Sequence, residues 1–277
     1  MSALSPTRTI ETDVQHAWLT IWLNRPESRN ALNEEITTEL HNTLQVVQDD
    51  RSVRGITLRG RGGVFCAGGD LKAFQSDFQG GAESHQLVAA ASRRAGELFR
   101  LVNEMPQVVV ILVEGAAIAG GLGLACAGDL VVVTRESQFA LTETTLGIAP
   151  AQIAPFVVQR LGLSAARRLM LTAARFDGEE AQRIGLADQV VDDVDALDDA
   201  ALEAVRGSDL WIVDALRWTP HPTHAHVDRA LEWIERTGVP NAVLTNLHLD
   251  LDYRSLKSRL PAHVDVAHDG WTARFSL

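Results

Sequence analysis

The stretch "AAIAGGLGLACAGDL", Ala116 to Leu130, consists mostly of residues with little or no side chain. It follows "VVVILVEG" (Val108–Gly115), whose run of β-branched residues predicts a buried strand. Glycine inside a helix costs about 0.5–1 kcal/mol relative to alanine, so several glycines at this place need a physical reason. We infer that another segment or a ligand comes close to this backbone.

A companion stretch, "GRGGVFCAGGDLKAF" (Gly60–Phe74), also runs from a strand into a glycine-rich turn and a helix. A helix N-terminus presents unpaired N–H groups and a partial positive charge. Two such ends facing each other could hold a carbonyl oxygen that becomes negative during a reaction, as in an oxyanion hole. Tight packing of helix on sheet also favours small residues, so either stretch alone leaves both interpretations open. Neither stretch is a dinucleotide fingerprint or a phosphate loop.

Apolar periodicity predicts strands that alternate with helices, which indicates an α/β fold with parallel crossovers. Asn33 is the expected N-cap of the first long helix. The expected strands are Ala17–Pro26, Gly55–Gly60, Val108–Gly115 and Asp129–Leu141, and the expected helices are Asn33–Asp50, Ser84–Met105, Ile153–Leu161, Ser164–Thr172 and Gly178–Ile184.

Composition excludes several classes of protein. The 277 residues carry a net charge of −11, which argues against a general nucleic-acid binder, because such proteins need a basic face. With no uncharged apolar run of about 18 residues, no membrane span is expected, and the N-terminus lacks the apolar core of a signal peptide. These features predict a cytoplasmic protein. Cys66 and Cys126 lie in apolar surroundings and are expected to be small buried residues, not a disulfide.

Four motifs in a fixed order carry a family resemblance: "LNRPESRNAL" (Leu23–Leu32), "FCAGGDLKAF" (Phe65–Phe74), "VEGAAIAGGLGLACAGDL" (Val113–Leu130) and "FALTETTLGIAP" (Phe139–Pro150). Over about residues 10–206 the chain resembles the enoyl-CoA hydratase/isomerase superfamily, the crotonases. The resemblance implies a spiral of ββα units and an acyl-CoA thioester as substrate, with coenzyme A entering only as part of that substrate. It also implies a homo-oligomer, a trimer or a pair of trimers.

The resemblance assigns roles to individual residues. Gly69 and Gly120 match the two backbone N–H donors that hold the thioester oxygen, and Glu143 matches the family's second catalytic glutamate. The segment Gly69, Asp70, Leu71 and Lys72 matches the lining of the CoA and thioester site.

Three basic residues, Lys72, Arg25 and Arg29, are candidates to meet the CoA phosphates or adenine. Each of them, taken alone, is more simply explained as an ordinary surface charge, because most exposed lysines and arginines have no specific partner.

The family's first catalytic glutamate is absent, because Gly123 stands three residues after Gly120. Hydration of a conjugated double bond needs a base for the water and an acid for the α-carbon. Glu143 must therefore do both in turn, or a substrate group or water must assist. One carboxylate also suits the movement of a double bond. A hydratase, an isomerase and an inactive acyl-CoA-binding homologue are all open on this evidence.

"GLGL" without the glutamate, together with "APAQIAPFVV" (Ala149–Val158), resembles the hydratases of glutaconyl-type CoA esters. These are the 3-methylglutaconyl-CoA hydratases of leucine breakdown and the isohexenylglutaconyl-CoA hydratases of terpene breakdown, with the latter more similar. The resemblance predicts a hydro-lyase for such a substrate.

The chain changes character after about residue 206, which predicts a core domain, 1–206, and a C-terminal segment, 207–277. This tail resembles the C-terminal fragment of a metallo-β-lactamase-fold phosphodiesterase, in which Asp214 and His248 would match metal ligands. The same resemblance implies β-α-β-α-β order for the segment. The principal metal motif of such enzymes is missing, so no metal site is expected and a metallo-phosphodiesterase is the weakest alternative. A partial fold should leave apolar faces in need of cover around Trp211, Ile212, Trp233 and Leu244.

Overall fold

The computed structural model describes residues 4–15, 17–50, 52–70, 82–200, 211–215, 218–219, 226–237, 239–245, 247, 251–268 and 271. The chain forms two compact units, Met1–Ala201 and Leu202–Leu277, and each is described by itself. Their boundary lies a few residues before the junction expected at 206.

A six-stranded sheet forms the centre of the first unit, in the order β1-β2-β3-β4-β6-β8. Only β1 and β2 run antiparallel, and the other neighbours are parallel. The central strands β4 and β6 are nearly continuous buried apolar runs, because parallel strands are covered on both faces. The sequence pattern predicted β2, β3 and β4, wrongly extended the β6 strand to Leu141, and did not predict β1 or β8. The strands are β1 (Ile10–Gln15), β2 (Trp18–Leu23), β3 (Gly55–Gly60), β4 (Val108–Val113), β6 (Leu130–Thr134) and β8 (Gln189–Val191).

A second, thinner layer of extended chain accompanies this sheet. Strands β5 (Ala116–Ile118) and β7 (Gln138–Ala140) pair in parallel, and single bridges join Leu32 to Gly69 and Cys66 to Ala117. Each turn of the chain thus contributes a main strand, a short second-layer segment and a helix. This repetition is the spiral of ββα units that the resemblance implied, and it confirms the expected fold class.

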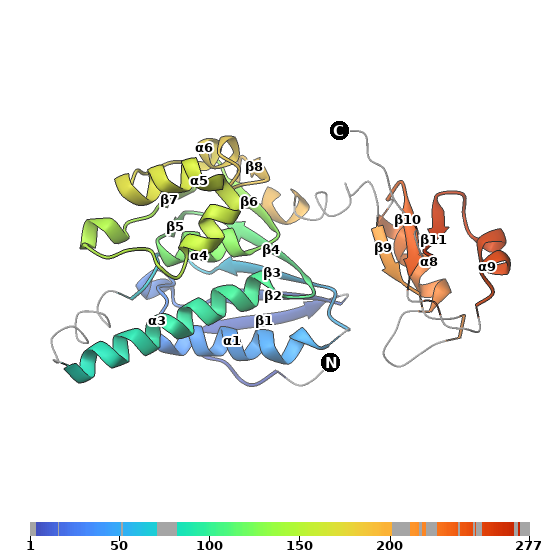
Figure 1. The fold of residues 1–277 in the computed structure, drawn as a ribbon, viewed down its shortest axis with the longest axis horizontal. Coiled ribbons are helices and arrows are strands. Elements are labelled where there is room, and N and C mark those ends of the chain that lie inside the picture. Colours follow the sequence, from blue (N-terminus) through green and yellow to red (C-terminus); the bar gives the residue numbers. More distant parts are fainter. Residues whose placement is uncertain are drawn as a thin grey trace. The chain divides into compact units, whose positions relative to one another are not determined.

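The helices close each turn of the spiral. Asn33 caps the first of them, because its side chain accepts a 3.0 Å hydrogen bond from the amide of Ile36. Helices α1 and α3 lie side by side (Figure 1). The helices of this unit are α1 (Glu34–Gln48), α3 (Ala82–Asn103), α4 (Gly120–Ala127), α5 (Ala154–Thr172) and α6 (Gly178–Arg183), with 3-10 turns η1 (Pro26–Ser28) and η2 (Glu143–Leu146).

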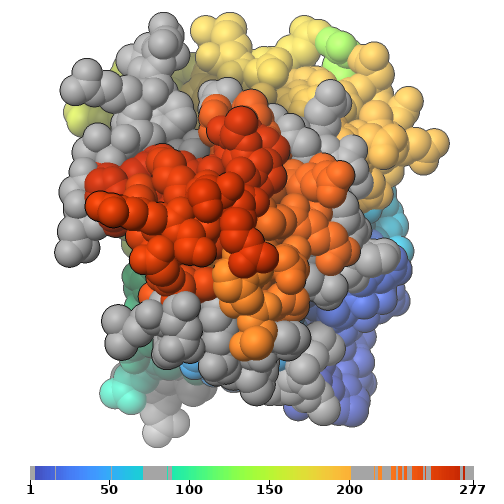
Figure 2. Space-filling model, turned by 90° about the vertical axis from the view of Figure 1, so that its right-hand side faces the viewer, coloured from blue at the N-terminus to red at the C-terminus, as the bar shows by residue number. Residues whose placement is uncertain are grey.

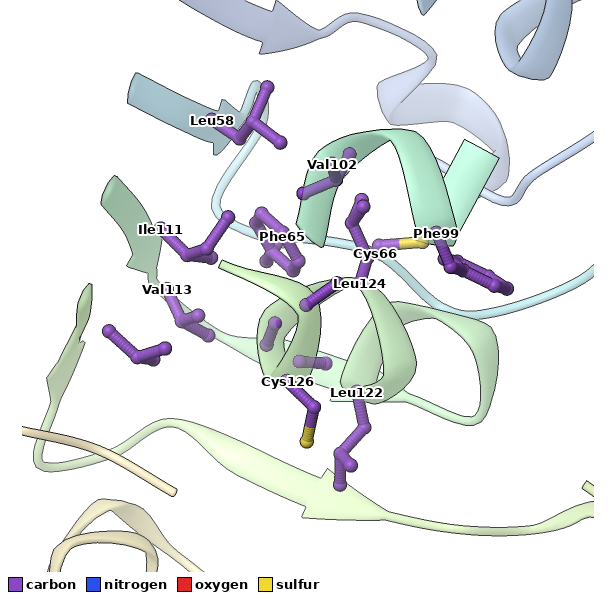
Figure 3. Close-up of a cluster of buried hydrophobic side chains, with 14 of the residues drawn as sticks. Leu58, Phe65, Cys66, Phe99, Val102, Ile111, Val113, Leu122, Leu124 and Cys126 are labelled. Atoms are coloured by element: carbon purple, nitrogen blue, oxygen red, sulfur yellow. The ribbon is translucent and has the colours of Figure 1, made fainter. Parts of the chain in front are cut away.

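Helix α4, the small-residue helix, lies inside the core. All of its residues from Gly121 to Ala127 are buried. Leu122, Leu124 and Cys126 of α4 pack in one cluster with Phe65, Cys66 and side chains of β4 and α3 (Figure 3). Burial raises the pKa of both cysteine thiols to about 12, so Cys66 and Cys126 are unreactive core residues, as predicted.

The second unit has the predicted β-α-β-α-β order among its described residues: β9 (Trp211–Asp214), α8 (Val227–Thr237), β10 (Ala242–Thr245), α9 (Tyr253–Arg259) and β11 (Val264–Val266). Its three strands are parallel in the order β11-β10-β9, and its described surface is coloured orange to red in Figure 2. Leu244 is fully buried in the unit's own core with Ile234 and Val266, so it is not part of an uncovered face. The side chains of Trp211, Ile212 and Trp233 lie outside the description.

Gly162 interrupts α5 with φ 73° and ψ 160°, which explains why the sequence predicted two helices there. Only glycine adopts this conformation at low cost. A Cβ at this position would meet no atom within 4 Å. We therefore expect Gly162→Ala to lower the unfolding free energy by about 1–3 kcal/mol through backbone strain alone. Chemical denaturation measures this loss, and Ser164→Ala, on the exposed side of the same helix, should change it by less than about 0.5 kcal/mol.

Candidate functional site

The second layer brings Gly69 and Gly120 together. A Cβ placed on Gly120 would lie 3.8 Å from the amide nitrogen of Gly69. A Cβ on Gly68 would lie 3.4 Å from the amide nitrogen of Gly120 and 2.8 Å from the carbonyl oxygen of Ile118. The two glycine-rich turns are thus pressed against each other, as expected from their composition.

The hydrogen bonds of the turns leave both predicted donors available. Leu32 donates to the carbonyl of Gly68 (2.7 Å) and accepts from the amide of Asp70 (3.1 Å), so the intervening Gly69 amide points away from Leu32. Gly120 is the first residue of α4, where an amide has no acceptor within the helix. Within the described residues, neither amide has a hydrogen-bond acceptor. Two adjacent unpaired amides can hold one developing oxyanion.

Strained backbone precedes the second donor. Ala119 has φ 49° and ψ −117°, a conformation that costs a residue with a side chain about 1–3 kcal/mol. It is held there because its amide donates to Ala140 (2.8 Å) and its carbonyl accepts from Gly123 (3.0 Å). The strain sets the direction in which α4 begins and thus the direction of the Gly120 amide.

Asn30 links its own turn to the turn that follows β3. Its side chain is fully buried, accepts from the amide of Arg25 (2.8 Å) and donates to the carbonyls of Arg61 (2.9 Å) and Val64 (2.6 Å). Its φ of 55° is one that asparagine tolerates better than most residues. This residue lies in the quoted "LNRPESRNAL" motif. Its structural role could not be predicted from the motif, because Arg61 and Val64 come from a later turn of the chain.

The predicted CoA-binding residues have different positions. Arg25 is mostly buried, donates to the carbonyl of Ala31 (2.6 Å) and pairs with Asp70 (3.4 Å), so its guanidinium braces the Gly69 turn. Arg29 is exposed, and its carbonyl accepts from the amide of Ala67 (3.0 Å). Leu71 and Lys72 lie outside the described residues.

Glu143 opens the η2 turn, three residues after Ala140, the residue that accepts from Ala119. The hydrogen bond between Ala119 and Ala140 thus joins the start of α4 to the segment that carries Glu143. Oε2 of Glu143 is buried without a hydrogen-bond partner among the described residues, a state that it shares there with Oε1 of Gln107. Burial raises the pKa of Glu143, an effect that a hydrogen bond from its own backbone amide only partly offsets. A carboxylate of this kind is suited to accept and return a proton.

Apolar side chains lie beside Gly120. A Cβ on Gly120 would lie 3.4 Å from Cδ1 of Leu32 and 3.7 Å from Cζ of Phe99. Phe99 in turn meets Phe156 edge to face, with the ring centroids 6.3 Å apart. These residues suit an acyl chain, and the sequence did not reveal them because they come from three separate turns of the spiral.

Among the residues that the structure describes, no group of three or more histidine, cysteine, aspartate or glutamate side chains could hold a metal ion. His248, one of the two matched metal ligands, lies outside the description. The described residues contain no helix that is long and apolar enough to span a membrane.

Comparison with known proteins adds to this geometry. The family model described as enoyl-CoA hydratase/isomerase matches residues 13–232. A putative enoyl-CoA hydratase of Thermus thermophilus is 36% identical over 180 residues, which cover 65% of this chain and 70% of the relative. The 1,2-epoxyphenylacetyl-CoA isomerase of Escherichia coli is 31% identical over 251 residues, 90% of each chain.

A solved structure, Pseudomonas aeruginosa AtuE, matches with a TM-score of 0.69 and 48% identity over 72% of this chain and 76% of that one. The family match continues past residue 206, where the resemblance was expected to end. Similarity to the family therefore extends into the second unit, and the metallohydrolase resemblance of the tail stays a prediction.

Replacing Asn30 by alanine should leave one amide and two carbonyl groups, all partly buried, without their partner. Each such group costs about 1–3 kcal/mol, so we expect the unfolding free energy to fall by at least about 2 kcal/mol. Chemical denaturation gives the value. Asn103→Ala is the matched control, because that side chain makes one bond of 3.3 Å, and an equal loss in both variants would refute the role of Asn30.

Glu143→Gln should make the protein more stable at neutral pH. The raised pKa means that ionised Glu143 destabilises the folded state, and glutamine has no charge to desolvate. The penalty is complete above the raised pKa and disappears below the ordinary value of 4.5, where the carboxyl is protonated in both states. Melting temperatures of the two proteins should thus converge as the pH falls toward 4.5. A constant difference at all pH values would contradict the burial of this charge.

Proposed function

Because the chain belongs to the enoyl-CoA hydratase/isomerase family, we propose that it adds water to a 2-enoyl-CoA thioester with a single catalytic carboxylate, Glu143. The observation that carries this proposal is the buried Oε2 of Glu143, which has no hydrogen-bond partner among the described residues. The amides of Gly69 and Gly120 likewise have no acceptor there, and Glu143 follows Ala140, the residue that accepts from the amide of Ala119, by three positions. The proposed class is a hydro-lyase, and coenzyme A takes part as a portion of the substrate.

In the proposed reaction, the amides of Gly69 and Gly120 bind the thioester oxygen. Ionised Glu143 takes one proton from water as the water oxygen bonds to the β-carbon, and the π electrons move toward the thioester oxygen. The enolate that results is held by the two amides. Glu143, now protonated, delivers its proton to the α-carbon, so one water molecule is added and the carboxylate is restored.

The proposed substrate is a glutaconyl-type ester, isohexenylglutaconyl-CoA or 3-methylglutaconyl-CoA. Its support is the "APAQIAPFVV" motif and the apolar side chains of Leu32, Phe99 and Phe156. For the CoA phosphates we propose Arg29, which is exposed, together with Lys72, which the sequence motif suggests. Arg25 braces Asp70 and is better placed to support the site than to meet solvent-exposed phosphate. A homo-oligomer and a cytoplasmic location complete the proposal.

An enoyl-CoA isomerase is the second candidate. It is favoured by the single carboxylate and by the similarity to the Escherichia coli isomerase over 90% of both chains. In that case Glu143 would take a proton from one carbon of the acyl chain and return it to another, with the same two amides holding the enolate. The products separate the candidates, because only a hydratase forms a 3-hydroxyacyl-CoA.

The first experiment follows the loss of enoyl-thioester absorbance with isohexenylglutaconyl-CoA, 3-methylglutaconyl-CoA and crotonyl-CoA, and identifies the products by mass. We expect a 3-hydroxyacyl product from the glutaconyl esters. Glu143→Gln should lower kcat by about 10²–10⁴-fold, the usual contribution of a general acid–base group. A variant as fast as the parent would remove Glu143 from the mechanism. Products of unchanged mass with a moved double bond would establish the isomerase.

The pH dependence gives an independent check. Since proton abstraction needs ionised Glu143, kcat/KM should rise with pH and level off above the raised pKa of this group. The acidic limb should therefore lie above pH 4.5, the ordinary glutamate value. A limb centred at or below that value would show that Glu143 titrates as an exposed carboxyl.

A further inference from the structure

Gly123 has no room for a side chain, because Ile153 occupies its place. A Cβ on Gly123 would lie 2.1 Å from Cγ2 and 2.6 Å from Cβ of Ile153. The β-branched isoleucine cannot turn away from this contact, since its Cβ is fixed to the backbone and its rotamers are few. Any larger residue at 123 therefore requires the backbone at 153 to move.

Ile153 is held firmly at this place. It is 3% exposed, stands at the N-cap of α5, and its carbonyl accepts a 3.0 Å hydrogen bond from the amide of Val157. The preceding Gln152 fits in the same manner, since a Cβ on Gly96 of α3 would lie 2.1 Å from Oε1 of Gln152. Two consecutive residues thus fill gaps that glycines leave in two different helices.

The filled gap adjoins the thioester-binding groups. Gly120 and Gly123 are three residues apart on α4, so they lie on one side of the helix. On that side, Gly120 faces Leu32, Phe99 and the Gly69 amide, while Gly123 faces Ile153. A side chain at 123 would therefore project next to the bound acyl group, and in this chain that volume holds hydrocarbon.

We propose that Ile153 is a specificity-determining residue that takes the place of a second acid and confines proton transfer to Glu143. This proposal rests on the proposed hydration. Its chemical consequence is that unbranched 2-enoyl-CoA esters, which bring no acidic group of their own, are poor substrates. A side chain at 123 and the isoleucine at 153 exclude each other, so a second carboxylate can enter only if both positions change.

A stability cycle tests the exclusion without reference to activity. Gly123→Ala should lower Tm by roughly 5 °C in the parent, because overpacking a rigid site is costly. In an Ile153→Gly background, where the blocking Cβ is gone and glycine is an acceptable N-cap, the same change should leave Tm unchanged or raise it. An equal fall in both backgrounds would overturn the proposal.

An activity comparison tests the chemistry. The variant Gly123→Glu/Ile153→Gly should hydrate crotonyl-CoA with at least a tenfold higher kcat/KM than Gly123→Gln/Ile153→Gly, its uncharged isostere. Its pH profile should also show a second ionisation. Equal rates for the two variants would overturn the role of Ile153 in excluding an acid.

Failure of the proposed function gives a different result. In that case the parent and all variants would form no 3-hydroxyacyl product from any of the three esters. The stability cycle would still decide whether a side chain at 123 and Ile153 exclude each other.

Discussion

The close approach of two peptide segments governs the first unit. Cys66 donates to Ala116 (2.9 Å) and accepts from Ile118 (2.9 Å), which locks the turn after β3 onto the second-layer strand β5. At this distance a Cβ on Gly121 would lie 2.3 Å from the carbonyl oxygen of Cys66. Small residues in this stretch are thus a packing requirement first. The same approach then sets two amide donors side by side.

Among the described residues, the candidate site contains unpaired and strained groups, whereas the residues around it are well bonded. The Asn30 side chain makes hydrogen bonds to three backbone groups, and Arg25 pairs with Asp70. The chain around Gly69 is therefore held by several hydrogen bonds and an ion pair. In contrast, the Gly69 and Gly120 amides and Oε2 of Glu143 lack partners in the described structure, and Ala119 is strained. The two amides and the strained Ala119 lie together at the start of α4. Unsatisfied groups and strain that meet on a well-bonded scaffold are the usual signature of a site arranged for a ligand.

The second unit has the element order that we expected, but its buried core differs from the expectation. Its described elements have the expected β-α-β-α-β order, and its described strands pair in parallel around a core of their own. That core buries Leu244, which composition alone suggested would lack cover. Similarity to the enoyl-CoA hydratase/isomerase family continues to residue 232, so the change in composition near 206 does not mark the end of the family match.

The sequence by itself determined the alternation of strands and helices, the Asn33 cap, the burial of both cysteines and the identity of Gly69, Gly120 and Glu143 as candidates. These properties depend on periodicity, on local hydrogen bonding and on quoted motifs. Tertiary structure alone decided that the two amides have no acceptor among the described residues, that Glu143 is desolvated, and that Ile153 fills the gap at Gly123. The reason is physical: each of these depends on atoms from separate turns of the spiral, whose distances only the folded chain sets.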